Sequence, residues 1–328
     1  MSLPSFKLLR PRDIKEAVTH LSAHAGNVRI LAGGTDLIPS MKQRLFTPAY
    51  VMDIRGIEEM RGIHVVPGSG VEIGALTSLS AIEDSELIRR DYRVLHEAVS
   101  TVASPILRNM GTLGGNICLD TRCVWYNQSL QWRRSCGFCI KKDGDLCHVA
   151  PGGKRCWAAF SGDTPPALLC LNAELEIAGP NSLRRLALKD FYSNIGEAHL
   201  KLGKDEMLTR VFLPESSSGW KGSYLKLRIR GSIDYPLAGV AVAFKKNGGP
   251  IEAANVAITA VNPGPLLVTA AEHALVGKQI DEHTATVVGE LAAKTAKPLT
   301  TSALTPEYRR EMVRVFAKRA VLAAAKCN

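Results

Sequence analysis

The chain has 328 residues, of which 46% are hydrophobic, and this is enough to bury the cores of two domains without disulfide bonds. The formal net charge is +10, but aromatic residues make up only 6% and no basic run alternates with aromatic side chains, which argues against nucleic-acid binding. No apolar run suits a signal sequence or a membrane span, so we expect a cytoplasmic protein without a membrane contact.

The first elements predict a strand-helix-strand unit that ends in a glycine turn. Strands are expected at 6–10 and 28–32, with a helix at 13–24 between them. Gly33-Gly34-Thr35 follows the second strand directly and precedes a helix that reaches about residue 44. Such a turn lies at the carboxyl end of a parallel sheet, where free backbone N–H groups suit a phosphate.

A second glycine turn follows a mixed set of strands and helices. We expect strands at 50–54, 62–66, 71–75, 167–170, 175–177 and 207–213, and helices at 79–87 and 93–102, the latter terminated before Pro105. The second turn is Thr112-Leu113-Gly114-Gly115-Asn116. Two turns rich in backbone N–H groups could hold the two halves of one pyrophosphate.

The C-terminal part predicts a separate lobe. After the linker-like residues 215–219, we expect an antiparallel meander of three strands at 223–230, 237–244 and 253–261. Three helices are expected to follow at 267–276, 282–295 and 306–325. The last helix carries Arg309, Arg310, Arg314, Lys318 and Arg319, which are expected to face solvent, with a contact to a partner subunit as the alternative. The fold class is therefore α+β. Residues 1–214 form a domain with a small βαβ subdomain and a mixed α/β subdomain, and 219–328 form a lobe of three-stranded antiparallel sheet with helices.

Six of the eight cysteines lie between Cys118 and Cys156, a stretch of 39 residues. In a reducing compartment such a cluster indicates a metal or redox site rather than disulfides. The two-residue spacing of Cys136 and Cys139 by itself favours both as ligands of one metal or cluster. The segment 120–160 has seven basic and three acidic residues, a net charge of +4 that would offset bound thiolates. Both iron and zinc remain open at this point.

Four ordered motifs give the chain a nearly full-length resemblance to the FAD-binding subunits of the xanthine oxidase family of molybdenum hydroxylases. The motifs are Leu31-Ala32-Gly33-Gly34-Thr35-Asp36-Leu37, Ser104-Pro105 with Arg108-Asn109, Thr112-Leu113-Gly114-Gly115-Asn116, and Ser161-Gly162-Asp163 before Pro165-Pro166. The resemblance implies that residues 1–214 bind FAD. It implies FAD contacts from Ile30, Leu31, Ala32, Gly33, Gly34, Thr35, Asp36, Leu37, Val102, Thr112, Leu113, Gly114, Gly115, Asn116, Asp163 and Lys226.

Two of these positions have specific implied roles. Asp163 would hold a hydroxyl of the cofactor, and Lys226 would lie near the edge of the flavin. For Lys226 the alternative is an exposed lysine on a strand. No catalytic residue is expected on this chain, because the resemblance implies that the substrate site lies on a partner subunit.

The family pattern is interrupted by an insertion at about 118–160, because 44 residues separate Asn116 from Ser161. In this feature the chain resembles the branch of 4-hydroxybenzoyl-CoA reductase, whose flavoprotein subunit carries an additional 4Fe-4S cluster. The resemblance implies Cys123, Cys139, Cys147 and Cys156 as the ligands, with Cys136 as a possible replacement for one of them. Cys118, Cys170 and Cys327 are then ordinary thiols. The spacings within this ligand set lack the two close pairs of a zinc ribbon.

The implied function is electron transfer in an (αβγ)2 complex with a molybdopterin-containing subunit and a 2Fe-2S subunit. Reduced ferredoxin would supply electrons through the 4Fe-4S cluster and FAD for reductive dehydroxylation of 4-hydroxybenzoyl-CoA to benzoyl-CoA. One alternative is an oxidative hydroxylase that delivers electrons to NAD or a quinone. Another is a zinc-stabilised nucleic-acid-binding module, which would leave both glycine turns without a role.

Overall fold

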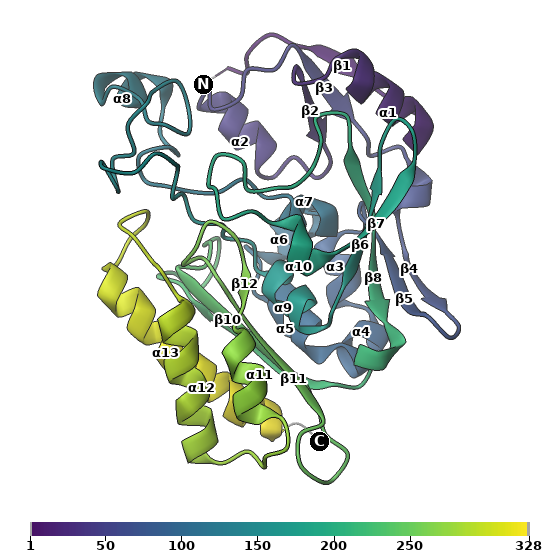
Figure 1. Ribbon diagram of the computed structural model, residues 1–328. Helices are drawn as coiled ribbons and strands as arrows, with labels where there is room; N and C mark the ends of the chain where they lie inside the picture. Colours follow the sequence, from purple (N-terminus) through teal and green to yellow (C-terminus); the bar gives the residue numbers. More distant parts are fainter. Residues whose placement is uncertain (1, 327–328) are drawn as a thin grey trace.

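The computed structural model describes residues 2–326. The N-terminal subdomain contains a small parallel sheet (Figure 1). Its elements are β1 (Lys7–Leu9), α1 (Ile14–Ala23), β2 (Val28–Leu31), α2 (Leu37–Lys42) and β3 (Tyr50–Asp53). The strand order is β1-β3-β2, and both pairings are parallel. Asp13 starts α1 by accepting a hydrogen bond from the Glu16 amide at 2.8 Å. The βαβ prediction is confirmed.

The second subdomain packs helices around a five-stranded antiparallel sheet. Its elements are η1 (Glu58–Met60), β4 (Ile63–Val66), β5 (Gly70–Gly74), α3 (Leu79–Glu83), α4 (Glu86–Asp91), α5 (Arg93–Ser100), α6 (Pro105–Met110), α7 (Leu113–Ile117), α8 (Leu130–Ser135), α9 (Thr164–Cys170), β6 (Glu174–Ala178), β7 (Leu183–Ala187), α10 (Leu188–Phe191), β8 (Met207–Pro214) and η2 (Glu215–Ser217). The strand order β4-β5-β8-β6-β7 joins strands from both sides of the cysteine-rich stretch.

The C-terminal lobe is an antiparallel sheet covered by helices. Its elements are β9 (Lys221–Leu227), β10 (Ala238–Lys245), β11 (Ala253–Thr259), β12 (Leu266–Leu267), α11 (Thr269–Leu275), α12 (Glu282–Thr295) and α13 (Pro306–Ala325). The order β12-β11-β10-β9 adds the two-residue β12 to the three predicted strands. Val240 and Val242 pack with the helices of the lobe, whereas Ala241 and Ala243 pack with the N-terminal domain. Both faces of β10 are therefore buried, which explains its continuous apolar sequence.

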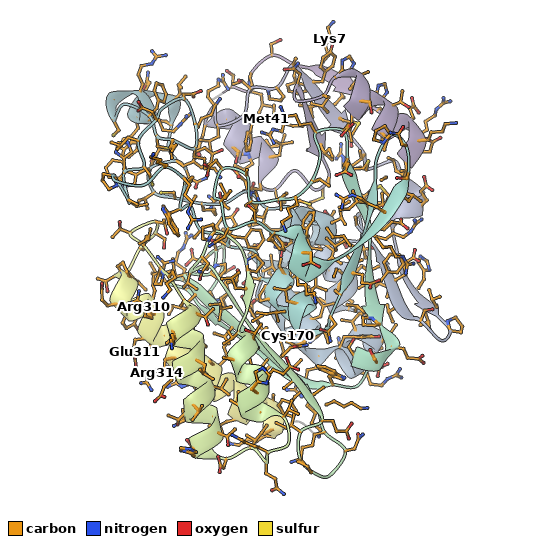
Figure 2. The ribbon with its side chains drawn as sticks, viewed as in Figure 1. Lys7, Met41, Cys170, Arg310, Glu311 and Arg314 are labelled. Atoms are coloured by element: carbon orange, nitrogen blue, oxygen red, sulfur yellow. The ribbon has the colours of Figure 1, made fainter. Side chains whose placement is uncertain are left out.

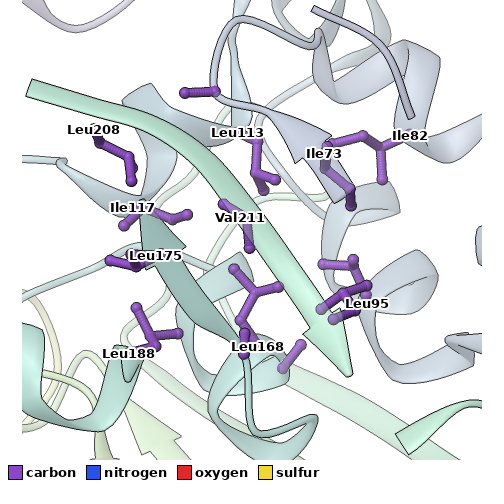
Figure 3. Close-up of a cluster of buried hydrophobic side chains, with 14 of the residues drawn as sticks. Ile73, Ile82, Leu95, Leu113, Ile117, Leu168, Leu175, Leu188, Leu208 and Val211 are labelled. Carbon is purple, nitrogen blue, oxygen red and sulfur yellow. The ribbon is translucent and has the colours of Figure 1, made fainter. Parts of the chain in front are cut away.

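The main core lies between the five-stranded sheet and the helices beside it (Figure 3). Leu175 and Val211 project from the sheet toward Ile117 and Leu168, and all four side chains are fully buried. The two glycine turns are attached to elements that pack on this core, so their backbone positions are held by apolar burial.

Two predicted elements are wrong. Residues 167–170 form the end of helix α9 rather than a strand, because Pro165 and Pro166 fit the first turn of a helix and a short apolar run does not identify a strand by itself. The predicted helix 79–87 is interrupted, since Ser85 caps α4 as a new helix. Pro105 likewise begins helix α6, with Ser104 as its N-cap.

The predicted solvent-facing stripe of α13 contains one error. Arg310 and Arg314 lie on the exposed side of the helix, with Arg314 paired to Glu311 (Figure 2). Arg309 is completely buried instead and donates to the carbonyl oxygens of Leu237 and Leu299 at 2.8 and 2.9 Å. Its pKa is lowered to about 10 by burial. Arg309 therefore connects α13 to Leu237, just before strand β10, and to Leu299 in the segment that precedes the helix.

Residues 118–160, called the cysteine-rich segment below, contain little regular structure apart from α8. Arg122 and Ala159 form a two-way backbone hydrogen-bond pair at 2.7 and 2.8 Å, which closes the segment at its base. The Arg133 guanidinium donates to the Arg44 carbonyl oxygen at 2.8 Å and anchors the segment near α2. None of the helices formed by residues 2–326 combines the length and apolar character needed to cross a membrane.

Candidate functional site

The two glycine turns lie against each other. A Cβ atom added to Gly33 would stand 2.0 Å from the carbonyl oxygen of Met110 and 3.0 Å from the Cα atom of Gly111, just before the second turn. Only glycine permits this approach. Gly34 adopts a φ of +74°, a conformation that other residues rarely take. The sequence therefore needs both glycines, the first for close packing and the second for the turn.

The second turn is held by its own side chains. Thr112 caps α7 by accepting a hydrogen bond from the Gly115 amide at 3.1 Å, and Gly114 packs against Ala75 so closely that a Cβ atom would clash. The side-chain oxygen Oδ1 of Asn116 accepts hydrogen bonds from the backbone amide and the hydroxyl group of Thr164 at 3.0 and 2.8 Å. The turn is thus joined to the start of α9 across the cysteine-rich segment.

Both turns line one large cavity with a volume of about 1100 Å³. It exceeds the roughly 300–1,000 Å³ of ordinary small-molecule pockets, so it suits a large cofactor. The predicted residues that line it are Ile30, Ala32, Gly33, Gly34, Thr35, Asp36, Leu37, Val102, Thr112, Gly114, Gly115, Asn116 and Asp163. Leu31, Leu113 and Lys226 were also predicted but are not among the lining residues. The Leu113 side chain is buried in the main core.

Asp163 lies at the junction of the two domains. Its carboxylate accepts hydrogen bonds from the Tyr224 hydroxyl at 2.7 Å and from the Lys226 ammonium at 2.9 Å, both on strand β9. Burial raises the pKa of the Asp163 carboxyl, while Lys226 and Tyr224 act in the opposite direction. The Lys226 side chain is only 2% exposed, so the alternative of an exposed strand lysine is wrong.

Several lining residues were missed by sequence reasoning, because no motif marks them. The missed polar and aromatic residues include Asp120, Tyr126, Lys141, His199 and Tyr235. Lys141 pairs with Asp120 at 2.7 Å and lies 4.6 Å from the centre of the Tyr126 ring. The pKa of His199 is lowered to about 4, chiefly by burial. Only the folded chain brings these residues to the cavity.

Four cysteines meet at a second, small cavity, called the thiol cavity below. Cys123, Cys139, Cys147 and Cys156 line it, and its volume of about 10 Å³ admits roughly one water-sized sphere. Cys136 is not among the lining residues. The seven cysteines among residues 2–326 are all free thiols, whereas Cys327 lies outside the described residues.

The surroundings of the thiol cavity are apolar but contain hydrogen-bond donors. The Ala158 amide donates to the Cys156 sulfur at 3.3 Å, and the Cys156 amide donates to the Glu197 carboxylate at 2.9 Å. Burial raises the pKa of Cys123 to about 11 and that of Cys156 to about 12. Burial therefore favours the neutral thiol form of both residues at neutral pH.

Two aromatic residues line the thiol cavity. Trp125 stacks on His148 with a centroid distance of 4.4 Å, and Tyr126 is buried. Tyr126 and Lys141 also line the large cavity, so the two cavities share a wall. Within residues 2–326, no group of three or more His, Cys, Asp or Glu side chains is arranged to hold a metal ion.

Comparison with known families decides what class of protein this is. Residues 4–216 match the FAD-binding domain in molybdopterin dehydrogenase, and residues 223–324 match the C-terminal domain of the carbon monoxide dehydrogenase flavoprotein. The chain belongs to the FAD-binding subunits of the molybdenum hydroxylases. This FAD-binding subunit is accordingly part of an oxidoreductase, and its α+β fold is the one predicted.

Individual relatives cover the FAD-binding subunit almost completely. The carbon monoxide dehydrogenase medium chain of Afipia carboxidovorans is 31% identical over 317 residues, covering 97% of this chain and 96% of the relative. The glyceraldehyde dehydrogenase medium chain of Sulfolobus acidocaldarius is 27% identical and covers 97% of both. A solved carbon monoxide dehydrogenase from Hydrogenophaga pseudoflava superposes with a TM-score of 0.81 at 28% identity, covering 100% of both chains.

Proposed function

We propose that this FAD-binding subunit is the electron-transfer subunit of a molybdenum enzyme of the 4-hydroxybenzoyl-CoA reductase type, and that it holds FAD and a 4Fe-4S cluster. FAD would occupy the large cavity, with the two turns at Ile30–Leu37 and Thr112–Asn116 along its pyrophosphate. The close packing at Gly33 supports this placement, because it brings the amides of both turns to one cavity. A bound flavin supplies exchange of one or two electrons.

The observation that carries the proposal is the thiol cavity. Cys123, Cys139, Cys147 and Cys156, the ligand set implied by resemblance, are the cysteines that line it, and Cys136 is not. These four cysteines are free thiols and surround one void. This combination suits a core that contributes its own iron and sulfide between the thiolates. The amide of Ala158 and the shared residue Lys141 fit the negative charge of such a core.

The partners and the substrate rest on the insertion in the cysteine-rich segment. In the proposed (αβγ)2 assembly, a molybdopterin-containing subunit carries the substrate site, a 2Fe-2S subunit connects it with this chain, and ferredoxin is the donor. The reaction is removal of the phenolic hydroxyl of 4-hydroxybenzoyl-CoA. Its test is formation of benzoyl-CoA by the assembled complex with reduced ferredoxin, and a complex that turns over only in the oxidative direction contradicts it.

The cofactor content is tested on the full chain with a matched pair of cysteine variants. We expect FAD and a cluster of four irons, seen by absorbance, iron analysis and low-temperature EPR. Cys147→Ser should lose the iron and keep FAD, whereas Cys136→Ser should keep both. Equal iron loss in the two variants contradicts the ligand set. Iron-free protein that binds FAD contradicts the cluster, and zinc without flavin contradicts the entire proposal.

The relatives favour one other function. They include subunits of carbon monoxide and glyceraldehyde dehydrogenases, which points to an oxidative enzyme whose flavoprotein subunit delivers electrons to NAD or a quinone. In that case the cysteine-rich segment is structural. Reduction of NAD or a quinone by the complex, with FAD bound and no iron on this chain, selects this alternative.

A further inference from the structure

Three side chains from distant parts of the sequence meet at the wall of the large cavity. Asp36 comes from the first glycine turn, Arg122 from the cysteine-rich segment and Tyr235 from the C-terminal lobe. The Arg122 guanidinium lies 3.2 Å from the Asp36 carboxylate, and the Tyr235 hydroxyl donates to the same carboxylate oxygen at 2.9 Å. The guanidinium carbon also lies 3.9 Å from the centre of the Tyr235 ring. Each member of this cluster, called the three-part clasp below, contacts both of the others.

The Asp36 side chain is committed to the clasp rather than to its own helix. It occupies the N-cap position of α2 but makes no side-chain cap hydrogen bond there. An aspartate at this position ordinarily accepts a hydrogen bond from a backbone amide of the first turn. Its carboxylate is instead directed to Arg122 and Tyr235, which join it to the other two parts of the chain.

Arg122 is the member with no contact to the large cavity. Asp36 and Tyr235 line that cavity, whereas Arg122 does not. Its backbone is paired with Ala159, and the next residue, Cys123, lines the thiol cavity. The position of the guanidinium therefore depends on the order of the cysteine-rich segment.

Tyr235 belongs to a loop that covers the large cavity from the C-terminal lobe. The Ile233 amide and the Ser232 hydroxyl both donate to the carbonyl oxygen of Ala103, at 2.8 and 3.1 Å. The loop is thus attached to the N-terminal domain at Ala103 and, through Tyr235, at Asp36. Without Arg122, one face of the Tyr235 ring loses its cationic partner and Asp36 loses its only ion pair in the clasp.

We infer that Arg122 is a positioning residue for the flavin cavity: by joining Asp36 and Tyr235, it makes tight FAD binding depend on an ordered cysteine-rich segment. The inference rests on the proposed placement of FAD in the large cavity. It gives the cysteine-rich segment a role in holding the cavity closed, in addition to the proposed cluster. Arg122 acts only through the two lining residues.

The test measures FAD affinity in the full chain purified with its partner subunits and stripped of flavin. We expect Arg122→Ala to raise the FAD Kd roughly five- to tenfold, from loss of one ion pair and one cation–π contact. Arg122→Lys keeps the charge but not the planar stacking group, so an intermediate Kd is expected. The control Arg134→Ala removes an exposed arginine of the same segment and should leave the Kd unchanged.

Two further readouts distinguish positioning from general destabilisation. The visible circular dichroism of bound FAD should change in Arg122→Ala but not in Arg134→Ala, while the iron content stays at the wild-type value in both. A Kd within twofold of wild type, with unchanged dichroism, overturns the inference. If Arg122→Ala does not fold, Arg122→Lys decides by the same criterion. Wild-type protein that binds no FAD overturns the proposed function and this inference together, whereas FAD binding that is insensitive to Arg122 overturns the inference alone.

Discussion

Replacing Gly33 with alanine should separate the two glycine turns. The added Cβ would stand 2.0 Å from the Met110 carbonyl oxygen, while real Cβ contacts below 3.0 Å essentially do not occur, so the backbones must move apart by about 1 Å. Overpacking of this kind costs about 1–3 kcal/mol. If the strain acts only on the FAD-bound arrangement, the FAD Kd rises roughly 5- to 150-fold. If the apoprotein is equally strained, the same energy is lost from its free energy of unfolding instead.

The two cases are resolved by measuring both quantities on the same protein. Flavin fluorescence titration gives the Kd, and urea unfolding of the flavin-free chain gives the stability. Gly56→Ala is the matched control, because no atom lies within 4 Å of the added Cβ and Gly56 does not have a positive φ. The reasoning is refuted if Gly33→Ala matches Gly56→Ala in both measurements.

Two further predictions concern buried charges. Lys226→Met should lower the free energy of unfolding at pH 7 by about 3–5 kcal/mol, because it leaves the buried Asp163 carboxylate without its cation. Adding Asp163→Asn should restore part of that loss, and a double variant no more stable than the single one in urea contradicts this explanation. Burial lowers the pKa of His199 from 6.5 to about 4. The unfolded chain therefore binds this proton at a higher pH than the folded chain does, and the free energy of unfolding should fall by up to about 3 kcal/mol as the pH drops from about 6.5 to 4. His199→Gln should remove this contribution, and equal pH dependence of unfolding in variant and wild type argues against it.

The local elements were largely predictable because their signals are short-range. Asp13, Ser78 and Thr305 cap helices through their own following amides, and the glycine turn at Gly34 requires a backbone conformation that its residue type permits. Where local signals were ambiguous the prediction was wrong. The apolar run at 167–170 does not by itself separate a strand from a buried helix, and in the structure it continues a helix whose first turn contains Pro165 and Pro166.

The surroundings of the candidate site were less predictable, because they depend on contacts between distant residues. Nothing near Arg309 in sequence indicates that it is buried, since its acceptors belong to Leu237, Ala260 and Leu299. Nothing near Lys226 in sequence indicates its burial either, because its ion-pair partner is the distant Asp163. The side chain of a basic residue on a helix or strand is expected to be exposed to solvent, unless acceptors from residues distant in sequence replace its hydrogen bonds to water.

The amino-acid sequence by itself determined the two glycine turns, the caps that start many of the helices and the supply of thiols in one segment, because these follow from the properties of neighbouring residues. Only the tertiary structure decided that Gly33 lies against Met110 and that Arg122 contacts Asp36 and Tyr235. It also decided which four of the cysteines line one cavity. These contacts join residues up to 199 positions apart. Their geometry depends on how the three sheets and their helices pack together, and burial of apolar surface determines that packing without regard to sequence distance.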